Sequence, residues 1–180
     1  MADEKKDDLK LKAKPSTKAV KKVKKETVKE VKPSEKKGPV KMESVIDAED
    51  CIAGRIASYT AKRLMKGETI SIVNAEKAVV SGNPKATQTF FEEKNKRGDP
   101  YHGPFYPRRP EMILRRMIRG MIPRQKAKGR DAFSRLKVFM SVPEEFKGRD
   151  FEVIEKTRNR LDHKFTTLGK ISKRLGANIE

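Results

Sequence analysis

Short apolar runs alternate with segments of helical composition along most of the chain. Four runs are rich in Val, Ile or Phe and are bounded by Gly, Pro or charged residues, which predicts β-strands. They cover residues 44–48, 69–74, 77–81 and 136–142. Three intervening segments predict helices. They cover residues 54–65, 85–96 and 111–119. Because parallel neighbouring strands need crossover helices, this alternation predicts an α/β domain with a largely parallel sheet.

The helix predicted over residues 54–65 is amphipathic. At about 100° per residue, its apolar side chains fall on one side. They are Ile56, Ala57, Ala61 and Leu64. The other side carries Tyr59 and the basic residues Arg55, Lys62 and Lys66, and Gly67 follows the helix as a stop signal. Taken alone, this pattern indicates an ordinary helix with a solvated basic face.

The helix that begins after Pro110 has a different polar face. Its apolar positions form one broad side and are predicted to enter the core: Ile113, Leu114, Met117, Ile118, Met121 and Ile122. Arginines occupy nearly all of the rest: Arg115, Arg116 and Arg119, together with Arg108 and Arg109 if the helix reaches back that far. Only Met112 lies among them, and Glu111 is the sole acid. A solvated face usually mixes charge signs, so an almost pure arginine face favours bidentate phosphate binding.

Basic residues continue on both sides of that helix. The preceding stretch, residues 101–110 (YHGPFYPRRP), interleaves aromatic and basic residues, and its rings fit either base stacking or local loop packing. Gly120 and Pro123 end the helix, and residues 124–130 are predicted to form a basic loop. The loop contributes Arg124, Lys126, Lys128 and Arg130. Gly129 would let its backbone approach a folded RNA closely.

The net charge points to the same class of partner. The 180 residues contain 44 Lys and Arg against 25 Asp and Glu, which gives +19. Such a balance indicates a polyanionic partner, either nucleic acid or an anionic membrane surface. A membrane-surface helix would carry Trp, Phe or Leu on its apolar side, whereas Met and Ile beside Pro123 are typical of a core.

The charge is unevenly distributed along the chain. Residues 1–41 contain 15 Lys, no Arg and 7 acids, for a net +8, and all eleven Phe and Tyr residues lie at Tyr59 or later. Such a segment cannot bury enough apolar surface to offset its ordering entropy. We therefore predict a disordered, lysine-rich extension over residues 1–41 and an α/β domain over residues 42–180.

Other function classes find little support. No window has the roughly 18 apolar residues of a membrane span, and the N-terminus has no apolar signal region, so we expect a soluble intracellular protein. Cys51, His102 and His163 form a poor metal set, and no motif ties Cys51 to a catalytic base.

Two stretches could suggest phosphate binding by a nucleotide enzyme. Residues 98–103 have the glycine spacing of a P-loop, but Pro104 and Phe105 stand where Lys and Ser or Thr are required. Residues 81–85 (SGNPK) fit a plain strand-to-helix turn better than a phosphate site. We expect no catalysis, no cofactor and no small-molecule substrate.

Several short motifs are specific in combination. The central ones are residues 118–123 (IRGMIP), 129–130 (GR) and 136–139 (LKVF). Further blocks are 47–48 with 54–58 (DA, GRIAS), 73–77 (VNAEK) and 80–82 (VSG). Together these motifs resemble the signature of the thirteenth universal large-subunit ribosomal protein family. Residues 103–105 with 108–110 (GPF, RRP) and 168–172 (LGKIS) are similar to the archaeal and eukaryotic branch of that family.

The resemblance implies a fold and a function. The fold is a three-layer α/β/α domain around a mainly parallel four-stranded sheet. The role is that of a structural, rRNA-binding protein in the large ribosomal subunit of the cytoplasm, which supports assembly and contacts neighbouring ribosomal proteins. The alternative is an RNA-binding translational regulator outside the ribosome.

Two sets of basic residues are the candidate rRNA-binding site. The main set is Arg108, Arg109, Arg115, Arg116, Arg119, Arg124, Lys126, Lys128 and Arg130. The second is Arg55, Lys62 and Lys66. We expect both to neutralise phosphates while the sheet holds them in register.

Overall fold

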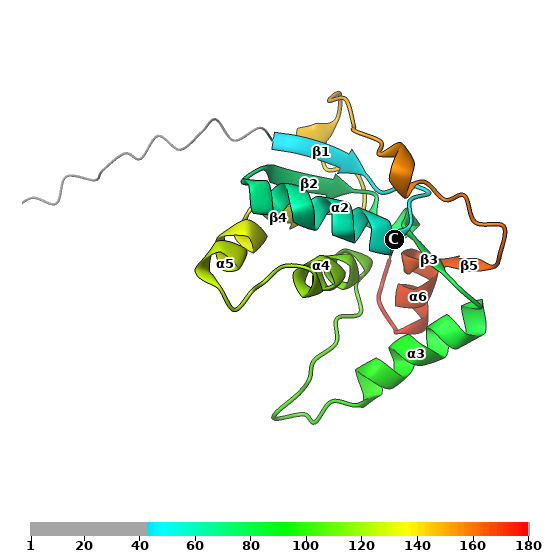
Figure 1. Cartoon of the computed structure of the whole chain (residues 1–180). Coiled ribbons are helices and arrows are strands. Elements are labelled where there is room, and N and C mark those ends of the chain that lie inside the picture. The colour runs from blue at the N-terminus through cyan, green and yellow to red at the C-terminus, as the bar shows by residue number, and fades with distance from the viewer. Residues whose placement is uncertain (1–42, 180) are drawn as a thin grey trace, which may run out of the picture. The chain divides into compact units, whose positions relative to one another are not determined.

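The computed structural model describes residues 43–179 (Figure 1). The predicted disorder of residues 1–41 lies outside the described residues. The strands are β1 (Glu43–Asp47), β2 (Thr69–Val73), β3 (Val79–Ser81), β4 (Leu136–Val138) and β5 (Phe165–Thr167). The α-helices are α2 (Ala53–Lys66), α3 (Pro84–Lys96), α4 (Pro110–Gly120), α5 (Ala127–Ser134) and α6 (Leu168–Arg174). The 3₁₀ helices are η1 (Ala75–Lys77), η2 (Glu144–Phe146) and η3 (Glu155–Thr157). The predicted α/β class is confirmed.

The prediction of a single four-stranded sheet is wrong. The parallel sheet has three strands in the order β1-β2-β4, while β3 pairs with β5 in a separate antiparallel ribbon. The cause lies directly after β2, where Asn74 adopts a left-handed conformation (φ 55°) and the short helix η1 follows. This turn redirects the chain, so the third apolar run leaves the sheet.

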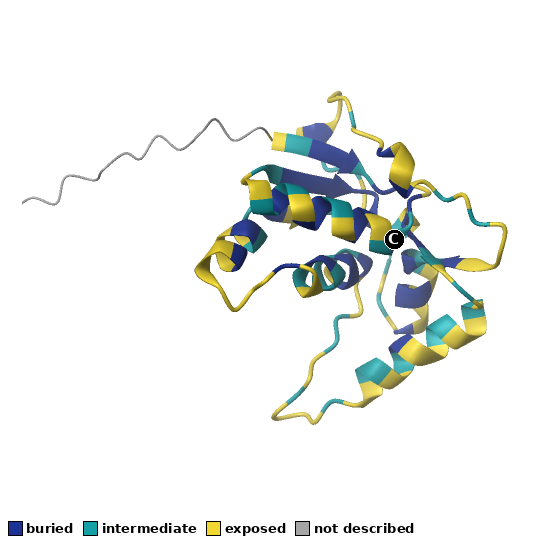
Figure 2. Cartoon of the chain, viewed as in Figure 1, coloured by how far each residue is buried: buried dark blue, intermediate teal, exposed yellow. Residues whose placement is uncertain are grey.

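The two faces of the parallel sheet are covered differently. Ile46, Ile70 and Ile72 belong to the main core with the buried sides of α2 and α4, and Figure 2 shows buried residues concentrated where these elements meet. On the other face, Val45 and Val73 pack with Phe146. The described residues provide no second helical layer there, which corrects the three-layer expectation. Pro143 and Gly148 keep the covering segment, residues 139–151, from forming a long helix.

Helix α2 follows its predicted pattern. Ile56, Ala57 and Leu64 are fully buried, and Ala61 is nearly so. The helix ends at Gly67, whose φ of 109° places it in the left-handed region that favours glycine. Within residues 43–179, neither this helix nor any other has the length and apolar character needed to cross a bilayer.

Most of the α4 residues that were predicted to face the core are buried. Ile113, Leu114 and Ile118 are fully buried, and Ile122 is 5% exposed. Met121 is 46% exposed, which corrects its assignment to the core. The helix ends at Gly120, so the helical wheel no longer gives the direction of the next side chain.

The basic loop predicted over residues 124–130 is also corrected. Helix α5 begins at Ala127 and includes Gly129, which is buried. A Cβ atom at Gly129 would lie 2.1 Å from the carbonyl oxygen of Pro123. Glycine is therefore needed because the first turn of α5 packs on the backbone that precedes it, rather than because RNA approaches there.

Candidate nucleic-acid interface

Two arginines of α4, Arg115 and Arg116, are held by aromatic rings, and Arg116 also by backbone. The guanidinium carbon of Arg115 lies 4.9 Å from the ring centre of Phe133 in α5. That of Arg116 lies 4.6 Å from the ring centre of Tyr106, and its Nη1 donates a hydrogen bond of 2.8 Å to the carbonyl oxygen of Phe105. Arg119, one turn beyond Arg115, is half-buried. The ring and backbone contacts preorganise the guanidinium groups of Arg115 and Arg116.

None of these three arginines forms an ion pair with the described residues. The acid of α4, Glu111, instead lies 3.8 Å from Arg109. Arginines without a carboxylate partner leave positive potential at the surface, which favours an anionic ligand.

A groove runs beside these arginines. Its volume is about 470 Å³, and it is lined by Phe105, Tyr106, Pro107, Met112, Arg115, Arg116, Arg119 and Phe133. The 105–107 segment, α4 and α5 all contribute, so the groove gathers side chains that lie far apart in the sequence. Phe105 and Met112 are 68% and 45% exposed, respectively.

The other members of the main set extend the basic surface. Arg108 and Arg109 precede α4 and are exposed. Arg124, Lys126, Lys128 and Arg130 lie just before or within the first half of α5 and are also exposed. The Arg115–Phe133 contact links the arginine face of α4 to α5, which carries Lys128 and Arg130.

The second set lies on α2. Arg55, Lys62 and Lys66 are exposed, as the helical wheel predicts. Lys62 and Lys66 border a shallow hollow that also contains Met121, from the end of α4. Lys62 and Lys66 of the α2 set therefore adjoin the C-terminal end of α4, whereas Arg55 is not part of the lining of this hollow.

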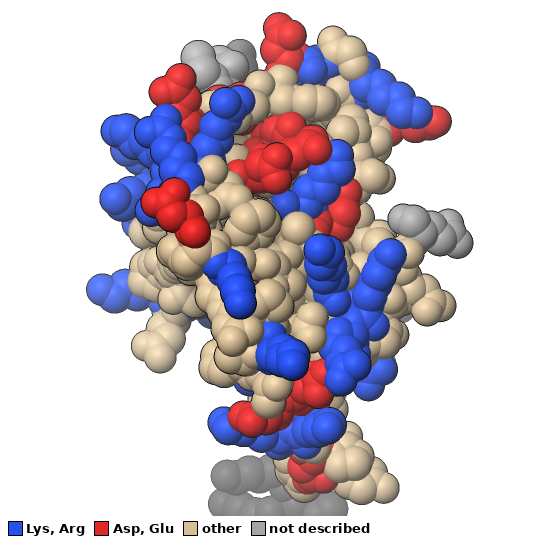
Figure 3. Space-filling view, turned by 90° about the vertical axis from the view of Figure 1, so that its right-hand side faces the viewer, with Lys and Arg blue, Asp and Glu red and all other residues tan. Residues whose placement is uncertain are grey.

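The face seen in Figure 3 differs in character. This view looks onto the side where β5 and α3 lie in Figure 1, and it shows acidic and basic side chains interspersed. Among the ion pairs of the described residues is Arg174 of α6 with Glu92 of α3, at 2.7 Å. Such a mixture is typical of a solvated surface.

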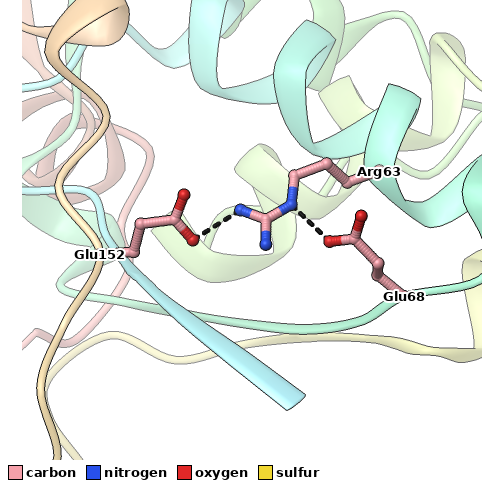
Figure 4. A network of polar contacts seen from close by, with 3 residues as sticks. All are labelled: Arg63, Glu68 and Glu152. Atoms are coloured by element: carbon pink, nitrogen blue, oxygen red, sulfur yellow. Dashed lines mark hydrogen bonds and ion pairs between the residues drawn. The ribbon is translucent and has the colours of Figure 1, made fainter. Parts of the chain in front are cut away.

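Arg63, which is in neither predicted set, is a structural cation. Its Nε and Nη1 atoms donate to Glu68 and Glu152 at 2.5 and 2.6 Å (Figure 4). Partial burial works against protonation, but the two hydrogen-bonded carboxylates prevail and raise the pKa of Arg63 above its ordinary value. The pattern of α2 carries no signal for this network, because Glu152 is 89 residues away.

The aromatic partners of the arginines are not evident in the sequence. The pattern around Tyr106 suggests only stacking or loop packing, and nothing local singles out Phe133. Burial raises the pKa of the Tyr106 hydroxyl, and the nearby charge of Arg116 opposes that rise. The tyrosine thus remains a neutral ring beneath a guanidinium group.

The residues considered for catalysis, nucleotide binding or metal binding lie in environments that fit a structural role. Cys51 is fully buried, and this burial raises the pKa of its thiol. The side chain of Asn83 accepts a hydrogen bond from the backbone N–H of Lys85, so it caps α3 in a strand-to-helix turn. His102 is exposed and lies 2.7 Å from Asp99. Within residues 43–179, no three His, Cys, Asp or Glu side chains gather as metal ligands.

Comparison with known proteins identifies the family. The model of the family described as ribosomal protein L13 matches residues 41–145. The chain is 47% identical over 136 residues to large ribosomal subunit protein uL13 of Archaeoglobus fulgidus, covering 74% of this chain and 87% of that protein. It is 47% identical over 139 residues to uL13 of Methanosarcina barkeri, covering 76% and 99%. For uL13 of Methanosphaera stadtmanae the identity is 41% over 142 residues, covering 77% and 100%. The matched span contains α2, α4 and α5 with their basic side chains, and the chain belongs to the ribosomal protein L13 family.

Proposed function

We propose that this chain is a structural constituent of the large ribosomal subunit that binds rRNA and supports subunit assembly. The observation that carries the proposal is the arginine face of α4, whose Arg115, Arg116 and Arg119 have no carboxylate partner among the described residues. Family membership and the printed names of the relatives support the same role.

The proposed mechanism is phosphate neutralisation from a rigid frame. A guanidinium stacked on a ring keeps its in-plane N–H donors available for phosphate oxygens. The guanidinium groups of Arg115 and Arg116 lie over rings from two other segments, at 4.9 and 4.6 Å from the ring centres. Because their geometry is set before binding, little side-chain entropy is lost when a phosphate arrives.

The proposed binding residues remain the two predicted sets. They are Arg108, Arg109, Arg115, Arg116, Arg119, Arg124, Lys126, Lys128 and Arg130, with Arg55, Lys62 and Lys66. Residues 42–180 form the proposed rRNA-binding domain, and residues 1–41 form an extension that adds positive charge. Neighbouring large-subunit proteins are further proposed partners, and some exposed basic residues would face them.

Co-sedimentation tests the role. A tagged full-length chain, expressed in place of the native protein, is followed through a density gradient after the ribosomal subunits are separated. We expect about one copy per large subunit. A chain that remains in the light fractions, bound to particular messenger RNAs, would contradict the proposal and favour the translational regulator. Crosslinking to rRNA then identifies the contacted helices.

A further inference from the structure

The groove beside α4 has a composition that phosphate neutralisation alone does not explain. We propose that it binds a single unpaired nucleotide, with the base against the exposed ring of Phe105 and the phosphate on the arginines. This inference rests on the proposed function, because it names the chemical form of the RNA that reaches this surface. A plain phosphate contact needs cations only, whereas most of the residues that line the groove are aromatic or apolar.

The aromatic residues fall into two kinds. Tyr106 and Phe133 are each covered by a guanidinium, at 4.6 and 4.9 Å. Phe105 is 68% exposed, and only its backbone carbonyl is held, by Arg116. Its backbone is thus anchored while its ring meets solvent. An exposed ring with a fixed backbone is a platform for stacking, because little freedom is lost when a second ring covers it.

Met112 completes the apolar side of the groove. It is 45% exposed and stands among the arginines of α4, where a solvated helix would carry a polar residue. Methionine adapts to the edge or face of an aromatic group through favourable sulfur contacts. Phe105 and Met112 together offer a flat, apolar ligand a surface to cover.

The charges require that ligand to be anionic as well. Arg115, Arg116 and Arg119 line the same groove, and the Nε atom of Arg115 is buried without a hydrogen-bond partner among the described residues. A ligand that is both flat and anionic matches a nucleotide. The acidic side chains of a peptide supply carboxylates but no aromatic face for Phe105, whereas each nucleotide carries both an anionic group and an aromatic face.

Size and shape separate an unpaired nucleotide from a duplex. A volume of about 470 Å³ falls in the range of small-molecule pockets, which is about 300–1,000 Å³. In an A-form duplex the base faces are stacked on one another and cannot cover a protein ring, whereas loops and bulges expose them. The groove therefore selects an extruded base and leaves paired segments to the surrounding cations.

The test separates stacking from charge. The full-length protein is titrated with two fluorescent 12-nucleotide probes, oligoadenylate and an abasic strand with the same backbone and charge, across a salt series. We expect tighter binding of oligoadenylate. Phe105→Leu should reduce its affinity at least about fivefold at every salt concentration, because the lost stacking carries no counterion release. Binding of the abasic strand should not change.

Phe165→Leu is the matched control. Phe165 lies in β5, is 43% exposed and is not part of the groove lining. We expect it to behave as wild type. Phe133→Leu provides a second groove variant, and its fold is checked by circular dichroism.

A wild-type protein that binds both probes equally would overturn the nucleotide site, as would a base preference that survives Phe105→Leu. Failure of the proposed function is distinguishable, because the salt dependence of binding to the abasic strand would then not respond to arginine substitutions.

Discussion

Arg63 and Arg115 both lie on helices and are both partly buried, yet their surroundings differ in kind. Arg63 is neutralised by Glu68 and Glu152, whereas Arg115 rests on the ring of Phe133 without an acid. A paired guanidinium contributes to the fold and adds little external field. A stacked, unpaired one keeps its charge available. The partner of an arginine, more than its exposure, indicates which of the two roles it has.

Charge removal on α4 should weaken RNA binding without unfolding the protein. We expect the double variant Arg115→Gln/Arg119→Gln to lower the slope of log affinity against log salt by about 2, because two phosphate contacts are lost. Binding to a large-subunit rRNA fragment is measured by titration across a salt series, and folding is checked by thermal unfolding.

The matched control removes two charges outside the candidate surface. Arg97 pairs with Glu93 at the end of α3, and Arg160 lies in the 158–164 loop; both are exposed. Arg97→Gln/Arg160→Gln should reduce the slope by less than the α4 pair does. Equal slopes in the wild type and the α4 variant would show that the arginine face is only a solvated surface.

Cys51 should report on folding. It is fully buried and burial raises its pKa, so the reactive thiolate is both scarce and inaccessible in the native state. We expect iodoacetamide to modify it slowly in buffer and completely in guanidinium chloride, as followed by intact mass. Rapid labelling of the native protein would mean that the segment around Cys51 opens readily.

At the level of elements, the start of α5 depends on one close backbone contact. Gly129→Ala would place a Cβ atom 2.1 Å from the Pro123 oxygen and 2.6 Å from its carbon. Because backbone must move, we expect a loss of about 1–3 kcal/mol of unfolding free energy or more. Denaturant unfolding monitored by circular dichroism measures it.

Gly120 is the natural control for that substitution. It lies at the end of α4, and a Cβ atom added there would meet no atom within 4 Å beyond its chain neighbours and the backbone of its own helix. Gly120→Ala should therefore be neutral or stabilise by up to about 1 kcal/mol. If both substitutions cost the same free energy, the Gly129 contact is not the cause.

Local patterns predicted most elements because each has its own signal. The wheel of α2 identified its buried side, and Gly67 marked its end. The predictions failed where contacts with another segment of the chain determine the local structure. The third apolar run pairs with β5, more than 80 residues later, and no local feature encodes that partner. Gly129 was predicted to lie in a loop, because the sequence does not reveal that this residue packs on Pro123.

The charged residues of the candidate site could be predicted from the sequence, but the groups that hold them in place could not. The arginine positions of α4 follow from helical periodicity, so the sequence alone places Arg115 and Arg119 on one face. Their supports could not be predicted in this way. Phe133 is 18 residues beyond Arg115, and the hydrogen bond from Arg116 to the carbonyl of Phe105 involves backbone, which has no sequence signature.

At the scale of the whole molecule, the lysine-rich extension should be separable from the folded domain. Deleting residues 1–41 removes a net +8 and no aromatic residue. We expect an unchanged midpoint of thermal unfolding and a weaker, less salt-dependent affinity for rRNA. A large fall in the midpoint would mean that the extension packs on the domain, and an unchanged affinity would mean that it does not meet RNA.

The arrangement of the sheet borders bears on how the protein behaves at high concentration. Open strand borders invite pairing with another copy. Here β4 has only three residues, and the border of β1 is occupied by Glu152, whose backbone N–H donates to Val45 while its carbonyl accepts from Asp47. The ion pair with Arg63 fastens that same residue. One glutamate thus occupies the β1 border, so a second copy of the chain cannot pair with the sheet there without displacing it.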